Sequence, residues 1–407
     1  MRGWIKWVVG LFAVLVVLLG LAVFALSQWA GSADFRDRAQ QMASSALGVP
    51  VTLGRIEIVV LPSLAVALHQ VRIGTKPPLT LEQIDATPVW SSLLAGKPTL
   101  DALVVRKAVL PQQGIMAVAT AAQKQQPASK PATPSAGPPP LPRRIVLDDV
   151  TWVDAAGQKL TVNAEVRFEG DLLPQNAKID VVGGRFAGAK ARLERQAELW
   201  QLRADIGGGT VTGPLRMQPQ KNGGWRFSGD LATKGVEVSA LTAPSKALTG
   251  RIEAKTSLGA DFKDPGQLAD VMRSQTHFTV RNAVLHGIDL AQAVRTLGVS
   301  RSGTTTLDTL TGDVATQGRA VHLTNLVANS GLLSATGHVS LAPDRSLSGK
   351  VSAVVGGGPL TAGVPLAVAG TVDSPSVYPT GIKLPGSDAV GNVGSKIGEG
   401  LKGLFGK

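Results

Sequence analysis

The chain has 407 residues and 44% of them are apolar, which is enough for one large core or two ordinary ones and excludes disorder throughout. Cysteine is absent, which excludes a disulfide scaffold, a thiolate zinc site, an iron–sulfur cluster and a cysteine nucleophile. The formal net charge is +12, yet only 17% of residues are charged, and 47 glycines and 25 prolines supply many turns. This composition predicts a turn-rich β protein.

Residues 1–33 are predicted to form a membrane anchor. The stretch 7–26 is nearly all apolar, and a helix of that length rises about 30 Å, the thickness of a hydrocarbon core. Tryptophans near both ends and a basic N-terminal flank favour a cytoplasmic N-terminus, with the bulk of the chain in the periplasm. A cleaved signal peptide is the alternative, because residues 25–27 form a small-x-small site. The predicted anchor residues are Trp7, Leu11, Leu15, Leu18, Leu21, Leu26 and Trp29.

Residues 34–110 are predicted to form an N-terminal β unit. A helix over 34–47, or a simple spacer, precedes alternating apolar positions over 51–73 that indicate paired strands. Thr87 and Pro88 have the character of an N-cap and a first-turn proline, which predicts a short helix ending near Gly96. The helix face over 34–47 is predicted to consist of Phe35, Ala39, Met42, Ala43 and Leu47.

Residues 111–144 are rich in Gln, Ala, Ser and Pro, which predicts a linker or disordered loop. Strand patterns with turn residues between them then recur over 145–380. No βαβ alternation is evident, so we expect an elongated antiparallel sheet. Two short helices are predicted to begin at 264–265 and at Asp289. Strands are predicted over 159–168, 176–182, 198–205, 223–231 and 248–258.

The clearest alternation lies near the end of this domain. Three consecutive strands each have one face of small and branched apolar side chains and one polar face. An ordinary sandwich core explains this pattern as well as a ligand-binding face does. The apolar positions are Leu333, Ala335, Val339, Leu341, Leu347, Val351, Ala353, Val355, Leu366, Val368 and Val372.

Residues 381–407 form a glycine-rich tail, for which an interfacial amphipathic helix and a disordered segment are both open interpretations. The apolar positions at helical spacing are Val393, Ile397, Leu401, Leu404 and Phe405.

Motifs for chemistry are not evident. The five histidines are scattered, no P-loop or nucleophile elbow occurs, and the GxGxxG at 398–403 follows no strand. Asp148, Asp149 and Asp154 are interpreted as solvated residues near turns. We therefore predict no catalytic residue, no metal and no cofactor. Aromatic residues make up only 4%, which disfavours nucleic-acid binding, and the positive charge fits anionic lipid instead.

The order of these parts resembles the AsmA family of envelope proteins. The matching segments are GVPVTLGRIEIVVLPSLAVALHQVRIG (48–74) and WSSLLAGKPTLDALVVRKAVLP (90–111) near the start. Near the end they are 304–353 and PLAVAGTVDSPSVYP (365–379). The resemblance covers roughly half the chain and rests on apolar and glycine positions rather than reactive residues.

The resemblance implies a repeating β groove anchored in the inner membrane. Such a protein would move phospholipid and support outer-membrane biogenesis and integrity, together with other envelope proteins. The apolar positions of the last three strands are then the candidate groove lining. Two alternatives stay open: an assembly or quality-control factor that binds strands of outer-membrane proteins, and an enzyme with an unrecognised polar site.

Overall fold

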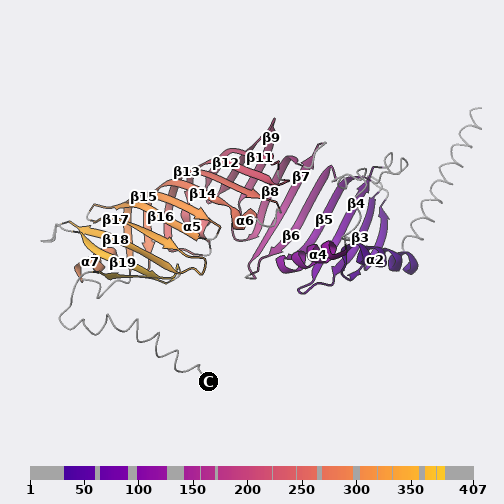
Figure 1. The fold of residues 1–407 in the computed structure, drawn as a ribbon, viewed down its shortest axis with the longest axis horizontal. Helices are drawn as coiled ribbons and strands as arrows, with labels where there is room; N and C mark the ends of the chain where they lie inside the picture. Colours follow the sequence, from indigo (N-terminus) through magenta and orange to yellow (C-terminus); the bar gives the residue numbers. More distant parts are fainter. Residues whose placement is uncertain are drawn as a thin grey trace, which may run out of the picture. The chain divides into compact units, whose positions relative to one another are not determined.

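A computed structural model describes residues 32–59, 65–89, 99–125, 142–155, 157–169, 173–221, 223–243, 245–263, 268–296, 303–318, 320–331, 333–356, 363–372 and 374–380 (Figure 1). Strand makes up 67% of the described residues, which confirms the predicted mainly β class. The chain divides into two compact units, unit 1 (Met1–Arg216) and unit 2 (Met217–Lys407).

Unit 1 contains strands β1 to β10 and most of β11. They pair in chain order from β2 onward, while β1 pairs with β3. The last residues of β11 pass into unit 2. The strands are β1 (Val51–Thr52), β2 (Arg55–Val59), β3 (Ala65–Ile73), β4 (Leu79–Pro88), β5 (Leu100–Pro111), β6 (Arg144–Val153), β7 (Lys159–Phe168), β8 (Pro174–Gly184), β9 (Lys190–Gln196), β10 (Leu199–Ile206) and β11 (Gly209–Pro219).

Unit 2 consists of nine described strands that pair antiparallel in chain order where their register is defined, from β12 to β20. They are β12 (Trp225–Glu237), β13 (Leu248–Phe262), β14 (Arg273–His286), β15 (Thr304–Gln317), β16 (Ala320–Asn329), β17 (Leu333–Leu341), β18 (Leu347–Val355), β19 (Val364–Gly370) and β20 (Pro375–Pro379). Three short helices accompany them: α5 (Val238–Thr242), α6 (Leu268–Val271) and α7 (Leu290–Arg295). The five strands predicted over 159–258 are confirmed, and α7 begins at the predicted cap Asp289.

Helix α2 (Ala33–Leu47) confirms the predicted helix at the start of unit 1. The Ser32 hydroxyl accepts a hydrogen bond from Phe35 N at 3.3 Å, and Gly48 ends the helix with a left-handed φ of 69°. Four of the five predicted apolar residues pack against β1 to β4, but Met42 is 66% exposed, so the predicted face was too wide.

Within each unit the described strands pair antiparallel, which confirms the predicted antiparallel sheet, with one exception in unit 1. Strands β5 and β6 are parallel, and helix α4 (Gln112–Gln125) lies in the connection between them. Parallel neighbours need a crossover of about a dozen residues or more, and the segment predicted as a linker provides it. Gly114 allows α4 to approach the loop between β3 and β4, because a Cβ at this position would lie 2.8 Å from the Pro77 carbonyl oxygen.

The predicted helix after Thr87 is wrong in its first residues. Thr87 and Pro88 continue strand β4 and pair with Ala102 and Leu100 of β5. The remainder of that predicted helix, over 90–96, lies outside the described residues. A proline is tolerated at the end of a strand, and the backbone pairing continues past it, since Val89 N donates to the Thr99 carbonyl oxygen at 2.9 Å.

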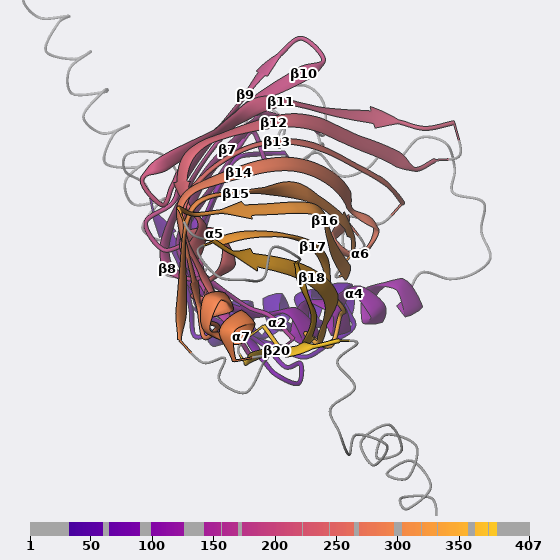
Figure 2. The same ribbon diagram turned by 90° about the vertical axis from the view of Figure 1, so that its left-hand side faces the viewer.

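Residues with left-handed backbone angles bend the strands of both units. Asp149 has a φ of 55° at a register shift between β6 and β7, and Asn325 has a φ of 51° at a register shift between β16 and β17. An extra residue in one strand makes that strand bend and twist more strongly. Figure 2 shows the resulting curvature of the strands in unit 2.

Candidate functional site

An uninterrupted apolar row crosses unit 1 from strand to strand. Each of its residues lies directly opposite the next on the neighbouring strand, so all of them share one face of the sheet. The unit 1 apolar row consists of Leu68, Ile84, Val105, Leu147, Ala164, Ile179, Ala191, Ala204 and Val211, one from each strand β3 to β11. A second row beside it is also apolar over eight strands: Val66, Ala86, Leu103, Ile145, Val166, Ala177, Leu193 and Leu202.

This apolar face is covered at one end and accessible at the other. At the β3–β4 end, Leu68 and Ile84 pack in the same hydrophobic cluster as the apolar residues of helix α2. From β8 to β11 the residues of the unit 1 apolar row are half-buried or exposed, and Ile179 is 38% exposed. Unit 1 therefore presents branched apolar side chains to its surroundings over several adjacent strands, at a free-energy cost of about 25 cal/mol for each Å² exposed.

The opposite face of the unit 1 sheet is polar. The residues adjacent to the apolar row on β7 to β10 are Glu165, Lys178, Arg192 and Arg203. Hydrogen bonds from Arg167 and then Arg144 hold the pKa of Glu165 below its usual value, although burial opposes this shift. On these strands the apolar row and the residues adjacent to it thus differ sharply in polarity.

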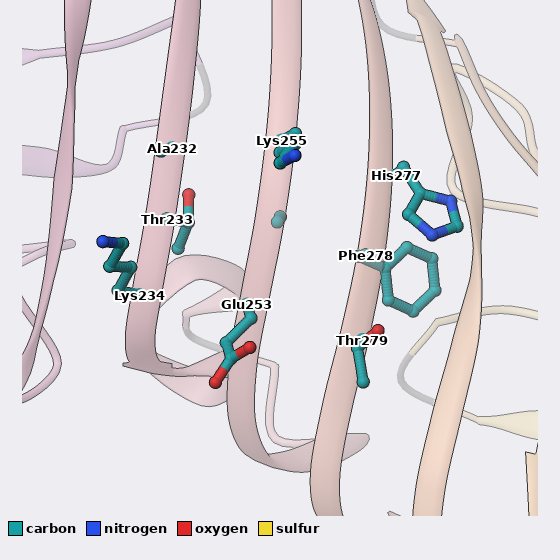
Figure 3. A pocket seen from close by; sticks show the side chains of 9 residues that line it. Ala232, Thr233, Lys234, Glu253, Lys255, His277, Phe278 and Thr279 are labelled. Atoms are coloured by element: carbon teal, nitrogen blue, oxygen red, sulfur yellow. The ribbon is translucent and has the colours of Figure 1, made fainter.

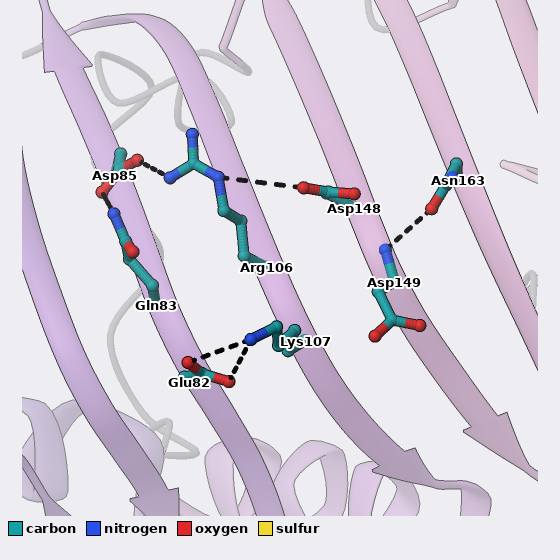
Figure 4. Close-up of polar contacts among 8 residues, drawn as sticks. All are labelled: Glu82, Gln83, Asp85, Arg106, Lys107, Asp148, Asp149 and Asn163. Atoms are coloured by element: carbon teal, nitrogen blue, oxygen red, sulfur yellow. Dashed lines mark hydrogen bonds and ion pairs between the residues drawn. The ribbon is translucent and has the colours of Figure 1, made fainter.

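The polar face also contains the acids considered in the sequence. Figure 4 shows Arg106 between Asp85, to which it donates a hydrogen bond, and Asp148, whose carboxylate lies 3.9 Å away. The amide of Asp149 donates to Asn163, and Asp154 accepts from Gln158 N within a turn. These three carboxylates do not converge, and the described residues contain no group of three His, Asp or Glu side chains placed to hold a metal.

Unit 2 has a corresponding apolar row that is largely buried. Val236, Val280 and Ala353 in it are at most 1% exposed. The unit 2 apolar row consists of Val236, Ile252, Val280, Leu310, Ala328, Ala335, Ala353 and Val364, one from each strand β12 to β19. All of these residues except Val236 belong to the principal core cluster of this unit or pack against it, and α7 and β20 also contribute to that cluster.

An apolar cavity of about 290 Å³ lies beside this row. Its lining comes from β13 to β20 and from the start of α7 with the residues before it, so strands far apart along the chain contribute to one cavity. Among the described lining residues, Thr336 alone has a polar side chain. A cavity without polar partners suits an aliphatic ligand, because a buried polar group without a hydrogen bond is unfavourable.

The structure places the predicted groove residues in three sets. Six line the cavity: Ala335, Val339, Leu347, Val351, Val368 and Val372. Four others pack in the same core cluster without lining the cavity: Leu333, Ala353, Val355 and Leu366. Leu341 is half-buried and belongs to neither set. Sequence reasoning missed the lining from β13 to β16 and the whole apolar face of unit 1.

A second, more open hollow of about 430 Å³ lies over β12 to β14 (Figure 3). It has charged residues at its border, but Lys234, Glu253 and His277 do not point toward a common centre in Figure 3. His277 is instead paired with Asp313, at 2.9 Å. Hydrogen bonds from Asn325 and then His277 lower the pKa of Asp313 from its usual value. This hollow offers no convergent set of groups for catalysis.

The predicted membrane anchor and the predicted interfacial tail lie outside the described residues. Within the described ranges, no helix combines the length and the apolar character needed to cross a membrane. Comparisons with protein-family profiles, curated proteins and solved structures find no match for this chain.

Proposed function

We propose that the protein is an AsmA-like envelope protein, anchored in the inner membrane, that binds phospholipid acyl chains on its apolar faces and transfers them through the periplasm. The observation that carries this proposal is the unit 1 apolar row, which is apolar on nine adjacent strands and half-exposed on most of them. At about 4.8 Å per strand, nine strands offer an apolar surface about 38 Å long.

The energetics favour an aliphatic ligand on this surface. Exposing an acyl chain of about 15 methylenes to water costs about 12 kcal/mol, at about 0.8 kcal/mol per methylene. A face that removes half of these methylenes from water gains about 6 kcal/mol, which corresponds to a Kd of tens of micromolar before the entropic costs of association. The headgroup stays in solvent, where the net charge of +12 favours anionic lipids.

The client-strand alternative has less support. Binding by strand addition needs a free sheet edge whose backbone amides are available. In the described part of unit 2, β20 pairs only with β19, and Pro375 and Pro379 occupy its two ends. Prolines at an edge block strand addition, since they lack the amide donor.

The test is a titration of the full-length chain in mild detergent with a phospholipid that carries a fluorescent label on one acyl chain. We expect saturable binding that unlabelled phospholipid reverses and that glycerophosphate, which has the headgroup chemistry without the chains, does not. Absence of binding, or equal displacement by glycerophosphate, would contradict the proposal.

A further inference from the structure

One short segment of unit 2 contributes both to the wall of the apolar cavity and to the core behind it. Ile288 and Leu290 line the cavity and are 5% and 6% exposed. Ala293 and Val294, one turn further along, are 0% and 4% exposed in the same core cluster. Helix α7 contacts β15 and β18, and both views place it at the end of unit 2 where β18 to β20 lie (Figures 1 and 2). We name Ile288–Val294 the end segment.

A buried threonine fixes the end segment in place. The Thr305 hydroxyl accepts a hydrogen bond from Leu290 N at 2.9 Å and donates one to the Ile288 carbonyl oxygen at 2.8 Å. Thr305 is itself only 5% exposed, so these bonds lie out of water. The Asp289 carboxylate accepts from Gln292 N at 2.8 Å and caps the helix. The backbone on both sides of the two lining side chains is therefore held firmly.

The cavity also has a limited size. Its volume is about 290 Å³, and none of the described residues that line it has a charged side chain. A charged headgroup placed inside would lose its hydration without gaining a partner, so a lipid can enter only with its aliphatic end first.

We propose that this cavity is a closed binding site for the methyl end of a single acyl chain, with the end segment as its terminal wall. This inference rests on the proposed function and adds to it a limit on chain length. The protein would thus hold the methyl end of the acyl chain in the cavity of unit 2 and would not transfer the whole lipid past this cavity. Leu290 and Ile288 are the residues that set the limit.

The limit can be measured on the full-length chain with saturated fatty acids of about ten to about twenty carbons. Because the protein has no cysteine, Val372→Cys provides a single attachment point for an environment-sensitive fluorophore at the cavity lining. We expect binding to tighten about fourfold with each added methylene until the cavity is full, and then to stop tightening.

Two variants in the labelled protein should move this limit in opposite directions. Leu290→Ala removes three carbons from the wall and should extend the limit by about three methylenes. Val339→Ile adds one carbon to the lining and should shorten it by about one. Val339→Ile still tests the limit if Leu290→Ala does not fold. Arg295→Ala, an exposed position on the same helix, is the matched control and should leave the limit unchanged.

The outcomes separate the two proposals. Affinity that keeps rising across the whole series, or a limit that neither lining variant moves, would overturn the closed end while leaving acyl binding intact. If no fatty acid changes the fluorescence and none displaces labelled phospholipid from the unmodified chain, the proposed function fails together with this inference.

Discussion

A single carboxylate in the exposed part of the unit 1 apolar row should abolish lipid binding while the protein stays folded. Ile179 suits this test, because it lies in the row between Ala164 and Ala191 and is 38% exposed. Replacing it with Asp loses roughly 60% of the burial free energy of an isoleucine, about 1 to 2 kcal/mol. Stability should therefore fall only moderately.

The effect on binding should be larger. An acyl chain that crosses β8 must leave the new carboxylate hydrated, which lifts about four methylenes off the face. At about 0.8 kcal/mol each, this costs about 3 kcal/mol and weakens binding more than a hundredfold. The assay is the labelled-phospholipid titration, with thermal unfolding followed by circular dichroism on the same samples.

The matched control is Val146→Asp. Val146 lies opposite Glu165 on the polar face, next in sequence to Leu147 of the apolar row. We expect this variant to bind lipid within about twofold of the parent. Equal losses of binding in the two variants, or unchanged binding in Ile179→Asp, would refute the assignment of the apolar face as the lipid site.

Three further outcomes follow from packing and charge. Leu366→Ala, at a fully buried position in unit 2, should lower the free energy of unfolding by about 2 to 5 kcal/mol in urea titrations, whereas Leu341→Ala should cost clearly less; equal costs would contradict the core described here. Gly184→Ala should cost about 1 to 3 kcal/mol, because Gly184 has a φ of 84° and an added Cβ would overlap the Lys159 carbonyl oxygen; an unchanged melting temperature would be inconsistent with this turn. The lowered pKa of Glu165 means that its ion pairs stabilise the fold above the unfolded-state pKa and lose this contribution as pH falls through the folded-state pKa. Glu165→Gln should therefore flatten the pH dependence of the melting temperature on the acidic side of the usual glutamate pKa; a pH profile parallel to that of the parent would exclude a role for this group.

The fold class was predictable from the sequence because strand periodicity is a local property. Leu160, Val162, Ala164 and Val166 alternate along one strand, and the structure forms β7 over those residues. Cross-strand register is not a local property of the sequence. The apolar rows are defined by that register, because it decides which residues of neighbouring strands lie opposite each other. The βαβ crossover was missed because α4 contains small and polar residues without a strong apolar stripe, and its docking depends on Gly114 approaching a distant loop.

The candidate site was predicted in part for the same reason. The faces of β17 to β19 stand out because each alternates cleanly, and five of their predicted residues line the cavity, together with Val372 just after β19. Ile288 and Leu290 could not be assigned to that cavity, since a loop and a one-turn helix carry no periodicity. Their position depends on Thr305, a single buried hydroxyl fifteen residues beyond Leu290.

The most direct test of the lipid-binding proposal is lipid mass spectrometry on the full-length chain purified in mild detergent, with Ile179→Asp and Val146→Asp purified in parallel. The account predicts that phospholipid copurifies in stoichiometric amounts with the parent and with Val146→Asp, and is strongly depleted from a folded Ile179→Asp. Folded parent protein that retains no phospholipid would contradict it.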